Sequence, residues 1–173
     1  LHNTTWGFLC PAETPEGQSI GVVKNISYMA HITVPTNSSA LYDYINPYLI
    51  DFEKIDDPCS LHSHVKVFIN GSWQGITTTP TELYADLKKK KHTGIINIYT
   101  SIIFIYKTRE IRICNDGGRL TRPVLRVENN KALITKEQIN LLVDKKLTWN
   151  DLLTNCNIDE SVIEYIDPEE QNV

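Results

Sequence analysis

The sequence is poor in the features that mark secreted, zinc-binding or membrane proteins. Its four cysteines lie far apart, form no Cys-x-x-Cys pair and predict neither a zinc knuckle nor a disulfide framework. We therefore expect reduced, buried thiols. The longest apolar stretch, residues 95–106, is interrupted by polar side chains and is too short to span a bilayer, so no membrane contact is expected.

Strong charge of either sign is also missing, because the net charge is only −4 over 173 residues. The chain as a whole therefore does not attract polyanions, and any contact with nucleic acid must come from local basic patches. The length allows one domain or two small ones. Because the sequence begins at Leu1 and ends at Val173 inside apparently structured segments, we expect it to be part of a larger polypeptide.

The most informative segment that is present is CPAETPEGQ at residues 10–18. Its two prolines fix backbone torsions and lack N–H donors, which disfavours regular structure and predicts a stiff loop. Apolar runs at residues 6–9 and 20–23 predict buried anchors on both sides. The loop would present three polar side chains in fixed directions: Glu13, Glu16 and Gln18.

Catalytic and metal-binding interpretations of these residues are weak. Two carboxylates on one short loop, without a histidine or a third carboxylate nearby, are too few for a self-sufficient site. His62-Ser63-His64 with Cys59 matches no standard zinc spacing, so we expect an exposed loop there. No metal site is predicted.

The pattern predicts an α+β fold with mostly antiparallel strands and short helices. Residues 65–69 alternate as a strand, and Asn70-Gly71 is a strong hairpin signal that returns the chain through Trp73. Further strands are predicted at residues 95–106, 110–114 and 119–127. Helices are predicted at residues 136–146 and over a short stretch after Thr148. Pro123 predicts an edge strand or a bulge.

A helix is predicted to begin at Thr79-Pro80, where a capping residue precedes a proline. It would bury Leu83 and Leu87 and end before Gly94. The lysines at residues 88–91 are interpreted as a solvated helix end, because cations suit the C-terminal end of the helix dipole. With the turn signals, these elements suggest three modules at residues 1–35, 36–105 and 106–173.

A group of arginines near the turn at residues 115–118 is the second candidate contact surface. On paired strands several of them would share one face, which suits nucleic acid or a partner protein. A solvated sheet face explains the same pattern equally well. The residues are Arg112, Arg119, Arg122 and Arg126.

Several motifs resemble the second-largest subunit of multisubunit DNA-dependent RNA polymerases, in the form found in eukaryotic polymerase II. LHNTTWG at residues 1–7, CPAETPEGQ and GVVKN at residues 21–25 resemble its fork region. VFINGSWQG at residues 67–75 resembles its first external domain, and residues 116–123 and 164–167 resemble its second. The resemblance implies a fork-side segment at 1–35, an external 1-like domain at 36–105 and an external 2-like domain at 106–173.

The resemblance implies a position beside the active centre of a DNA-directed RNA polymerase, which is a nucleotidyltransferase. It implies four active-centre-adjacent residues: Glu13, Glu16, Gly17 and Gln18. It implies no catalytic residue in this chain, because the ligands of the catalytic Mg²⁺ ions lie mainly elsewhere, and the zinc site of the full subunit also lies elsewhere. The chain alone is then expected to be inactive.

The implied partners are the largest subunit, other polymerase subunits, the DNA template, the RNA–DNA hybrid and nucleoside triphosphates. The Ile-, Asn- and Lys-rich composition resembles versions in large DNA viruses, which implies a viral origin. The implied location is intracellular, in the nucleus or, for a virus, in a cytoplasmic factory or virion. An alternative function is a stand-alone protein-interaction module built from the same domains.

Overall fold

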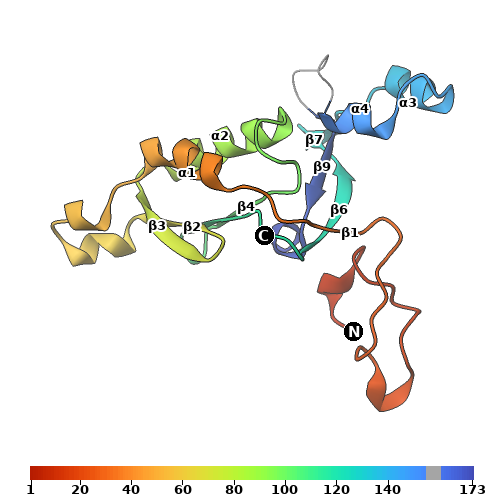
Figure 1. Cartoon of the computed structure of the whole chain (residues 1–173), viewed down its shortest axis with the longest axis horizontal. Helices are drawn as coiled ribbons and strands as arrows, with labels where there is room; N and C mark the ends of the chain where they lie inside the picture. Colours follow the sequence, from red (N-terminus) through yellow and green to blue (C-terminus); the bar gives the residue numbers. More distant parts are fainter. Residues whose placement is uncertain (155–160) are drawn as a thin grey trace.

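The computed structural model describes residues 1–154 and 161–173. Figure 1 shows an elongated molecule in which the N-terminal segment projects from a body made of two sheets. The predicted α+β fold with mostly antiparallel strands and short helices is confirmed. In the described part of the chain, no helix is long and apolar enough to cross a membrane.

The larger sheet has four strands in the order β3-β2-β5-β4. β2 (Val65–Ile69) and β3 (Ser72–Thr77) form the predicted hairpin, and Asn70 and Gly71 have the positive φ values of 49° and 80° that a tight turn of this kind requires. β4 (Ser101–Ile105) and β5 (Glu110–Cys114) form a second antiparallel pair. β5 joins the two pairs by running parallel to β2.

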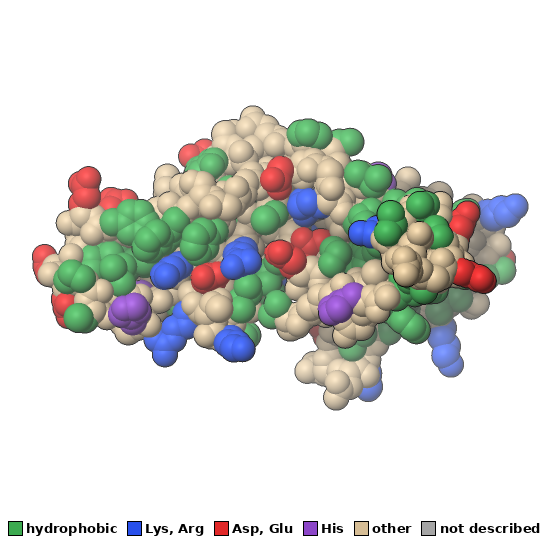
Figure 2. Space-filling view, turned by 90° about the horizontal axis from the view of Figure 1, so that it is seen from below, with side chains coloured by type: hydrophobic (Ala, Val, Ile, Leu, Met, Phe, Trp, Pro, Cys, Tyr) green, Lys and Arg blue, Asp and Glu red, His purple; other side chains and the backbone are tan. Residues whose placement is uncertain are grey.

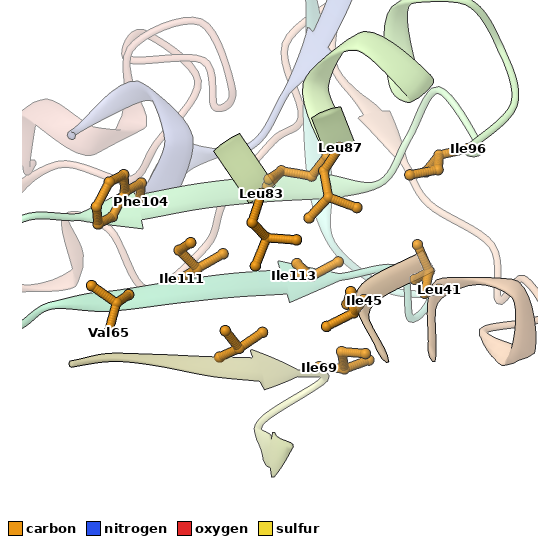
Figure 3. Close-up of a cluster of buried hydrophobic side chains, with 12 residues drawn as sticks. Leu41, Ile45, Val65, Ile69, Leu83, Leu87, Ile96, Phe104, Ile111 and Ile113 are labelled. Atoms are coloured by element: carbon orange, nitrogen blue, oxygen red, sulfur yellow. The ribbon is translucent and has the colours of Figure 1, made fainter. Parts of the chain in front are cut away.

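Two helices cover one face of this sheet. They are α1 (Ser39–Ile45) and α2 (Pro80–His92), and Figure 3 shows their apolar side chains pointing toward those of the strands. Leu83 and Leu87 are fully buried, as predicted, because their four-residue spacing places them on one side of α2. The main core contains Leu41, Ile45, Val65, Val67, Ile69, Leu83, Leu87, Ile96, Ile102, Phe104, Ile111 and Ile113.

The strand predicted over residues 95–106 is shorter than expected, since only Ser101–Ile105 pairs as β4. Residues 95–100 instead carry the chain from α2 to the sheet. The division predicted between residues 105 and 106 falls between β4 and β5, which are hydrogen-bonded neighbours. Strand pairing therefore does not follow that division.

The second sheet has three antiparallel strands in the order β1-β6-β9. They are β1 (His31–Ile32), β6 (Leu120–Leu125) and β9 (Ile163–Ile166). The strand that follows the turn at 115–118 therefore does not return beside β5, as the sequence suggested, but enters a different sheet. The edge strand predicted from Pro123 is wrong, because β6 is the middle strand of this sheet. The proline is tolerated because at Pro123 itself, among the described residues, β6 pairs with β9 alone.

Short helices and a small hairpin complete this half of the molecule. α3 (Lys136–Val143) begins with the predicted capping box between Thr135 and Gln138, although it ends before the expected residue 146. α4 (Trp149–Thr154) contributes Leu152 and Leu153 to a second apolar cluster with Val162 and Ile163. β7 (Val127–Glu128) and β8 (Lys131–Ala132) form the small hairpin, and α5 (Pro168–Gln171) follows β9. The 3₁₀ helices are Asn3–Thr5, Gly17–Ser19, Asn46–Tyr48, Phe52–Lys54 and Pro58–His62.

Candidate functional site: a tethered acidic loop

The CPAETPEGQ segment is a loop whose two ends are joined by backbone hydrogen bonds. Leu9 and Ile26 form an antiparallel bridge. Beside it, the Cys10 N–H donates to the Asn25 carbonyl oxygen at 2.9 Å, and the Ser27 N–H donates to the Phe8 carbonyl oxygen at 3.0 Å. These bonds close residues 10–25 into a single projecting loop, which Figure 1 shows at the end of the molecule away from the larger sheet.

Side-chain hydrogen bonds tie the loop to itself. The Thr14 hydroxyl accepts from the Gly21 N–H at 3.0 Å and donates to the Val23 carbonyl oxygen at 3.4 Å. The Asn25 side-chain amide donates to the Glu13 carbonyl oxygen at 2.9 Å. Because these bonds use the Glu13 backbone and the Thr14 hydroxyl, the acidic side chains do not take part in them.

The polar side chains predicted to be presented by the loop are exposed. Glu13, Glu16 and Gln18 all lie on the surface. Gly17, which has φ of 74°, begins the short 3₁₀ helix Gly17–Ser19. Within the described residues, no side-chain hydrogen bond or ion pair engages either carboxylate. The same residues also contain no group of three or more His, Cys, Asp or Glu side chains that could hold a metal ion. The exposed carboxylates of the loop can offer negative charge and hydrogen-bond acceptors to a group outside the loop.

The apolar segments beside the loop are not buried, contrary to the expectation from sequence. Trp6 is 78% exposed and Val22 is 74% exposed, whereas Phe8 is buried at 1%. The exposed apolar residues of the N-terminal segment are Leu1, Trp6, Ile20, Val22, Val23, Ile26, Tyr28, Met29, Ile32 and Val34. Figure 2, which views the molecule from the side of this segment, shows hydrophobic side chains on its surface. An exposed apolar surface of this extent is typical of a segment that packs against another protein surface.

The four candidate arginines do not form one patch, because Arg112 is on the larger sheet, the other three lie on β6 or just beyond its ends, and all four bond to the chain itself. Arg112, on the larger sheet, pairs with Glu110 at 2.8 Å. Arg119 donates to the carbonyl oxygens of Asp116 at 3.0 Å and Tyr99 at 2.9 Å. Arg122 donates to the Gln171 amide oxygen at 2.8 Å, and Arg126 donates to the Ser161 carbonyl oxygen at 2.6 Å.

A buried ionic cluster that was not predicted from the sequence lies where α2 meets β9 and α5. Lys91 is only 2% exposed, and its ammonium lies 3.4 Å from a carboxylate oxygen of Glu164 and 3.5 Å from one of Glu170. Lys88 forms a close ion pair with Glu164 and lies 3.9 Å from Glu170. The imidazole of His92 lies 3.3 Å from the other oxygen of Glu164. The interpretation of residues 88–91 as a solvated helix end is therefore wrong for Lys88 and Lys91.

Burial and pairing shift the pKa values of this cluster in opposite directions. Burial lowers the pKa of Lys91, because the charged form is poorly solvated, and the two glutamates only partly offset this. Burial also raises the pKa of Glu170, with Lys91 and Lys88 opposing the shift. For Glu164 burial is outweighed by His92, Lys91 and Lys88, so its pKa lies below the ordinary value. Glu164 is thus the carboxylate that pairs with both Lys88 and Lys91.

One sequence signal could have revealed the cluster. Lys91 follows Leu83 and Leu87 at intervals of four residues, which places its side chain on the buried side of the same helix. The spacing predicts burial of Lys91, but it does not identify the two glutamates more than seventy residues later in the chain.

The fold and the loop define a class of protein: an α+β module in which an acidic loop projects from a body built on sheets, with exposed apolar side chains beside the loop. The sequence comparisons agree. Residues 1–32 match the family described as RNA polymerase Rpb2, domain 3, and residues 67–128 match RNA polymerase Rpb2, domain 4. Together the two matches cover more than half of the chain.

Curated relatives extend the similarity over the whole chain. DNA-directed RNA polymerase II subunit RPB2 of Encephalitozoon cuniculi is 38% identical over 100% of this chain and 15% of its own length. DNA-directed RNA polymerase II subunit 2 of Arabidopsis thaliana is 35% identical, and DNA-directed RNA polymerase subunit 2 of Acanthamoeba polyphaga mimivirus is 36% identical, each over 99% of this chain and 14% of its own length. The chain belongs to the family of second-largest RNA polymerase subunits and spans about 15% of the length of these relatives.

Proposed function

We propose that this chain forms part of the wall of the active centre in a DNA-directed RNA polymerase, with its two sheets serving as outer scaffold. The proposed active-centre-adjacent residues are Glu13, Glu16, Gly17 and Gln18. The observation behind this proposal is the loop itself, which is tied at its base and across its middle while its acidic side chains stay exposed. A loop beside a moving template needs such preorganisation to hold its side chains in place.

The chain alone is expected to be inactive. Glu13 and Glu16 do not fit a metal centre by themselves, because the described residues offer no third ligand and no histidine close to them. In the proposed assembly the Mg²⁺ ions are therefore held mainly by residues outside this chain, and the zinc site of the full subunit also lies outside it. The role left to the loop is to orient the nucleotide or the template by charge and hydrogen bonding.

The exposed apolar residues around the loop support a position inside an assembly. Side chains such as Trp6, Val22 and Tyr28 are large, apolar and exposed, and gathered exposed apolar side chains mark surfaces that contact another protein. The proposed partners are the largest subunit and other polymerase subunits, and in the complete enzyme also the DNA template, the RNA–DNA hybrid and nucleoside triphosphates. The alternative of a stand-alone interaction module is not favoured, because the relatives described above are polymerase subunits.

The origin and location of the protein follow the same proposal. The mimivirus relative, together with the Ile-, Asn- and Lys-rich composition, supports a large DNA virus as the source. Polymerase subunits act inside cells, so we propose a location in the nucleus or, for a virus, in a cytoplasmic factory or virion.

The role of Glu16 is tested in the assembled polymerase by Glu16→Ala. If Glu16 contacts the nucleotide side of the active centre, loss of one charged hydrogen bond, about 1.5 kcal/mol, should change the rate or fidelity of single-nucleotide addition by roughly tenfold. Rapid-quench measurement of nucleotide addition on a preformed scaffold reports both values. Subunit composition, checked by gel filtration, should be unchanged because the Glu16 side chain is exposed.

The matched control is Glu53→Ala, which removes an exposed glutamate from the 3₁₀ helix Phe52–Lys54, whose Phe52 ring packs against Trp73 of β3. This variant should add nucleotides at the wild-type rate. An assembled Glu16→Ala enzyme with wild-type kinetics and fidelity would exclude the proposed role of Glu16.

A further inference from the structure

The N-terminal segment meets the body of the molecule through a small set of contacts around Phe8. Phe8 is 1% exposed, whereas most apolar side chains of this segment are on the surface. The guanidinium carbon of Arg122, on β6, lies 5.6 Å from the centre of the Phe8 ring, within the range of a cation–π contact. Phe8 in turn lies directly beside the bridge that closes the acidic loop. Arg122 therefore contacts the base of the loop and not its exposed tip.

A second contact from the same arginine reaches the segment through α5. The Arg122 Nε–H donates to the Gln171 amide oxygen at 2.8 Å, and the Gln171 amide nitrogen donates to the Trp6 carbonyl oxygen at 3.4 Å. Arg122 thus holds the side chain of Gln171 in the orientation that bonds the backbone of the N-terminal segment. Residues 6–8 are therefore held by two contacts: the Arg122 guanidinium over the Phe8 ring, and the hydrogen bonds from Arg122 through Gln171 to the Trp6 carbonyl oxygen.

Gly7 shows how closely the arginine approaches this backbone. A Cβ atom built on Gly7 would lie 2.8 Å from Cδ and 2.9 Å from Nε of Arg122. Gly7 also has a backbone φ of 78°, a value that residues other than glycine rarely adopt. A side chain at position 7 would displace Arg122 and strain the backbone, so this close approach depends on glycine.

We propose that Arg122 is a positioning residue that sets the orientation of the acidic loop relative to the body of the subunit. This inference rests on the function proposed for the loop. It assigns Arg122 an internal role in place of the contact with nucleic acid or a partner that the sequence suggested. The arginine acts through Phe8, Gln171 and the bridge at the base of the loop, and it touches neither nucleotide nor template.

The test compares three variants in the assembled polymerase. Arg122→Met keeps an unbranched apolar stem but removes the cation and the hydrogen bond to Gln171. Arg122→Lys keeps the cation over Phe8, and Gln171→Leu removes only the relay to Trp6. Arg109→Met is the matched control, because Arg109 is exposed on the turn after β4 and donates to the His62 carbonyl oxygen, far from the loop in the sequence and on the other sheet.

Two readouts separate positioning from a merely structural role. For Arg122→Met we expect kcat of nucleotide addition to fall by about 3- to 30-fold with a smaller change in KM, since misplacement of about 1 Å can cost as much as 100-fold. Arg122→Lys should recover part of this loss, and Gln171→Leu should give a smaller loss. Hydrogen exchange of peptides within residues 5–27 should rise in Arg122→Met and Gln171→Leu but not in Arg109→Met.

The outcomes distinguish this inference from the function proposed for the loop. Unchanged hydrogen exchange in assembled Arg122→Met would overturn the positioning role whatever the kinetics. The positioning role would also be overturned if Arg122→Met raised hydrogen exchange but left the kinetics unchanged, while the separate variant Glu16→Ala altered the kinetics. Raised exchange together with wild-type kinetics in both Arg122→Met and Glu16→Ala would instead refute the function proposed for the loop. If Arg122→Met does not assemble, Gln171→Leu gives the same decision from the exchange measurement.

Discussion

Replacing Lys91 with methionine tests whether the buried ionic cluster holds α2 to the β9–α5 segment. Methionine has a similar length and keeps the buried stem, but it removes the ammonium that lies 2.9 Å from the Tyr165 carbonyl oxygen and within 3.5 Å of two carboxylates. The change leaves Lys88 and His92 to face Glu164 and Glu170. Of the cluster's two lysines, only Lys88 then remains to balance the two carboxylates.

The expected loss of stability follows from that imbalance. Removing one partner from a buried ion pair costs about 3–5 kcal/mol, because the remaining charge stays in a poorly solvated site. Lys88 still contacts both glutamates, so we expect the lower end, about 3 kcal/mol. For a chain of this size that corresponds to a fall in Tm of roughly 6–12 °C.

Urea denaturation of the full chain at pH 7, followed by circular dichroism, measures the change in the free energy of unfolding. The double variant Lys91→Met/Glu170→Gln removes one charge of each sign, and the new amide oxygen can still accept from the Ile102 N–H. It should be more stable than Lys91→Met alone. As a surface control, Lys54→Met removes a lysine whose side chain is 73% exposed and should change stability by less than about 0.5 kcal/mol.

Two results would refute this reasoning. A loss below about 1 kcal/mol for Lys91→Met would give the cluster no more weight than an ordinary surface ion pair. A double variant no more stable than the single variant would mean that charge balance does not explain the loss.

Two further predictions concern titration. Because burial is outweighed by His92, Lys91 and Lys88, the pKa of Glu164 lies below its ordinary value of 4.5, so the stability it contributes is present above that value and is lost as the pH falls. Between roughly pH 5 and 3 the urea midpoint should therefore fall more steeply for the wild type than for Glu164→Gln, and equal slopes would contradict the assignment. Burial raises the pKa of the Cys114 thiol to about 11, so at pH 8 iodoacetamide should modify the exposed Cys59 at least about tenfold faster, and comparable rates in a peptide-mapping time course would disprove this.

Features encoded by a few neighbouring residues could be predicted from the sequence. The hairpin at Asn70-Gly71 and the capping box of Thr135 with Gln138 are confirmed, because each depends on side chains and backbone torsions within three residues. The start of α2 at Pro80 and the burial of Leu87 are also confirmed. In each case the local chemistry has one favoured outcome whatever the rest of the chain does.

Features that depend on distant partners could not be predicted in the same way. β6 leaves the path of a simple hairpin because Thr121 pairs with His31, ninety residues earlier, and Arg122 pairs with Ile166. The burial of Lys91 likewise depends on Glu164. The pattern of apolar and charged residues indicates which side chains need a packing or ionic partner, but it does not indicate which segment of the chain provides that partner.

The exposure of the loop's polar side chains was predicted from the sequence, but the surroundings of the loop were not. The exposed glutamates on a stiff loop agree with the sequence, because the prolines and Gly17 act locally. The expected burial of residues 6–9 and 20–23 was wrong for most of their side chains, since apolar character alone does not place the covering surface within the same chain.

The short helix α5 explains why the loop depends on residues near the other end of the sequence. A helix of four residues is not stable by itself, so its position must come from its side-chain contacts. Glu170 accepts from the Ile102 N–H at 3.0 Å and lies within the ionic cluster, which fixes α5 against α2 and the larger sheet. The next residue, Gln171, joins Arg122 to the backbone of Trp6. Two adjacent side chains therefore connect the rigid sheet to the base of the acidic loop, and this gives the exposed loop a defined position although few of its own residues are buried.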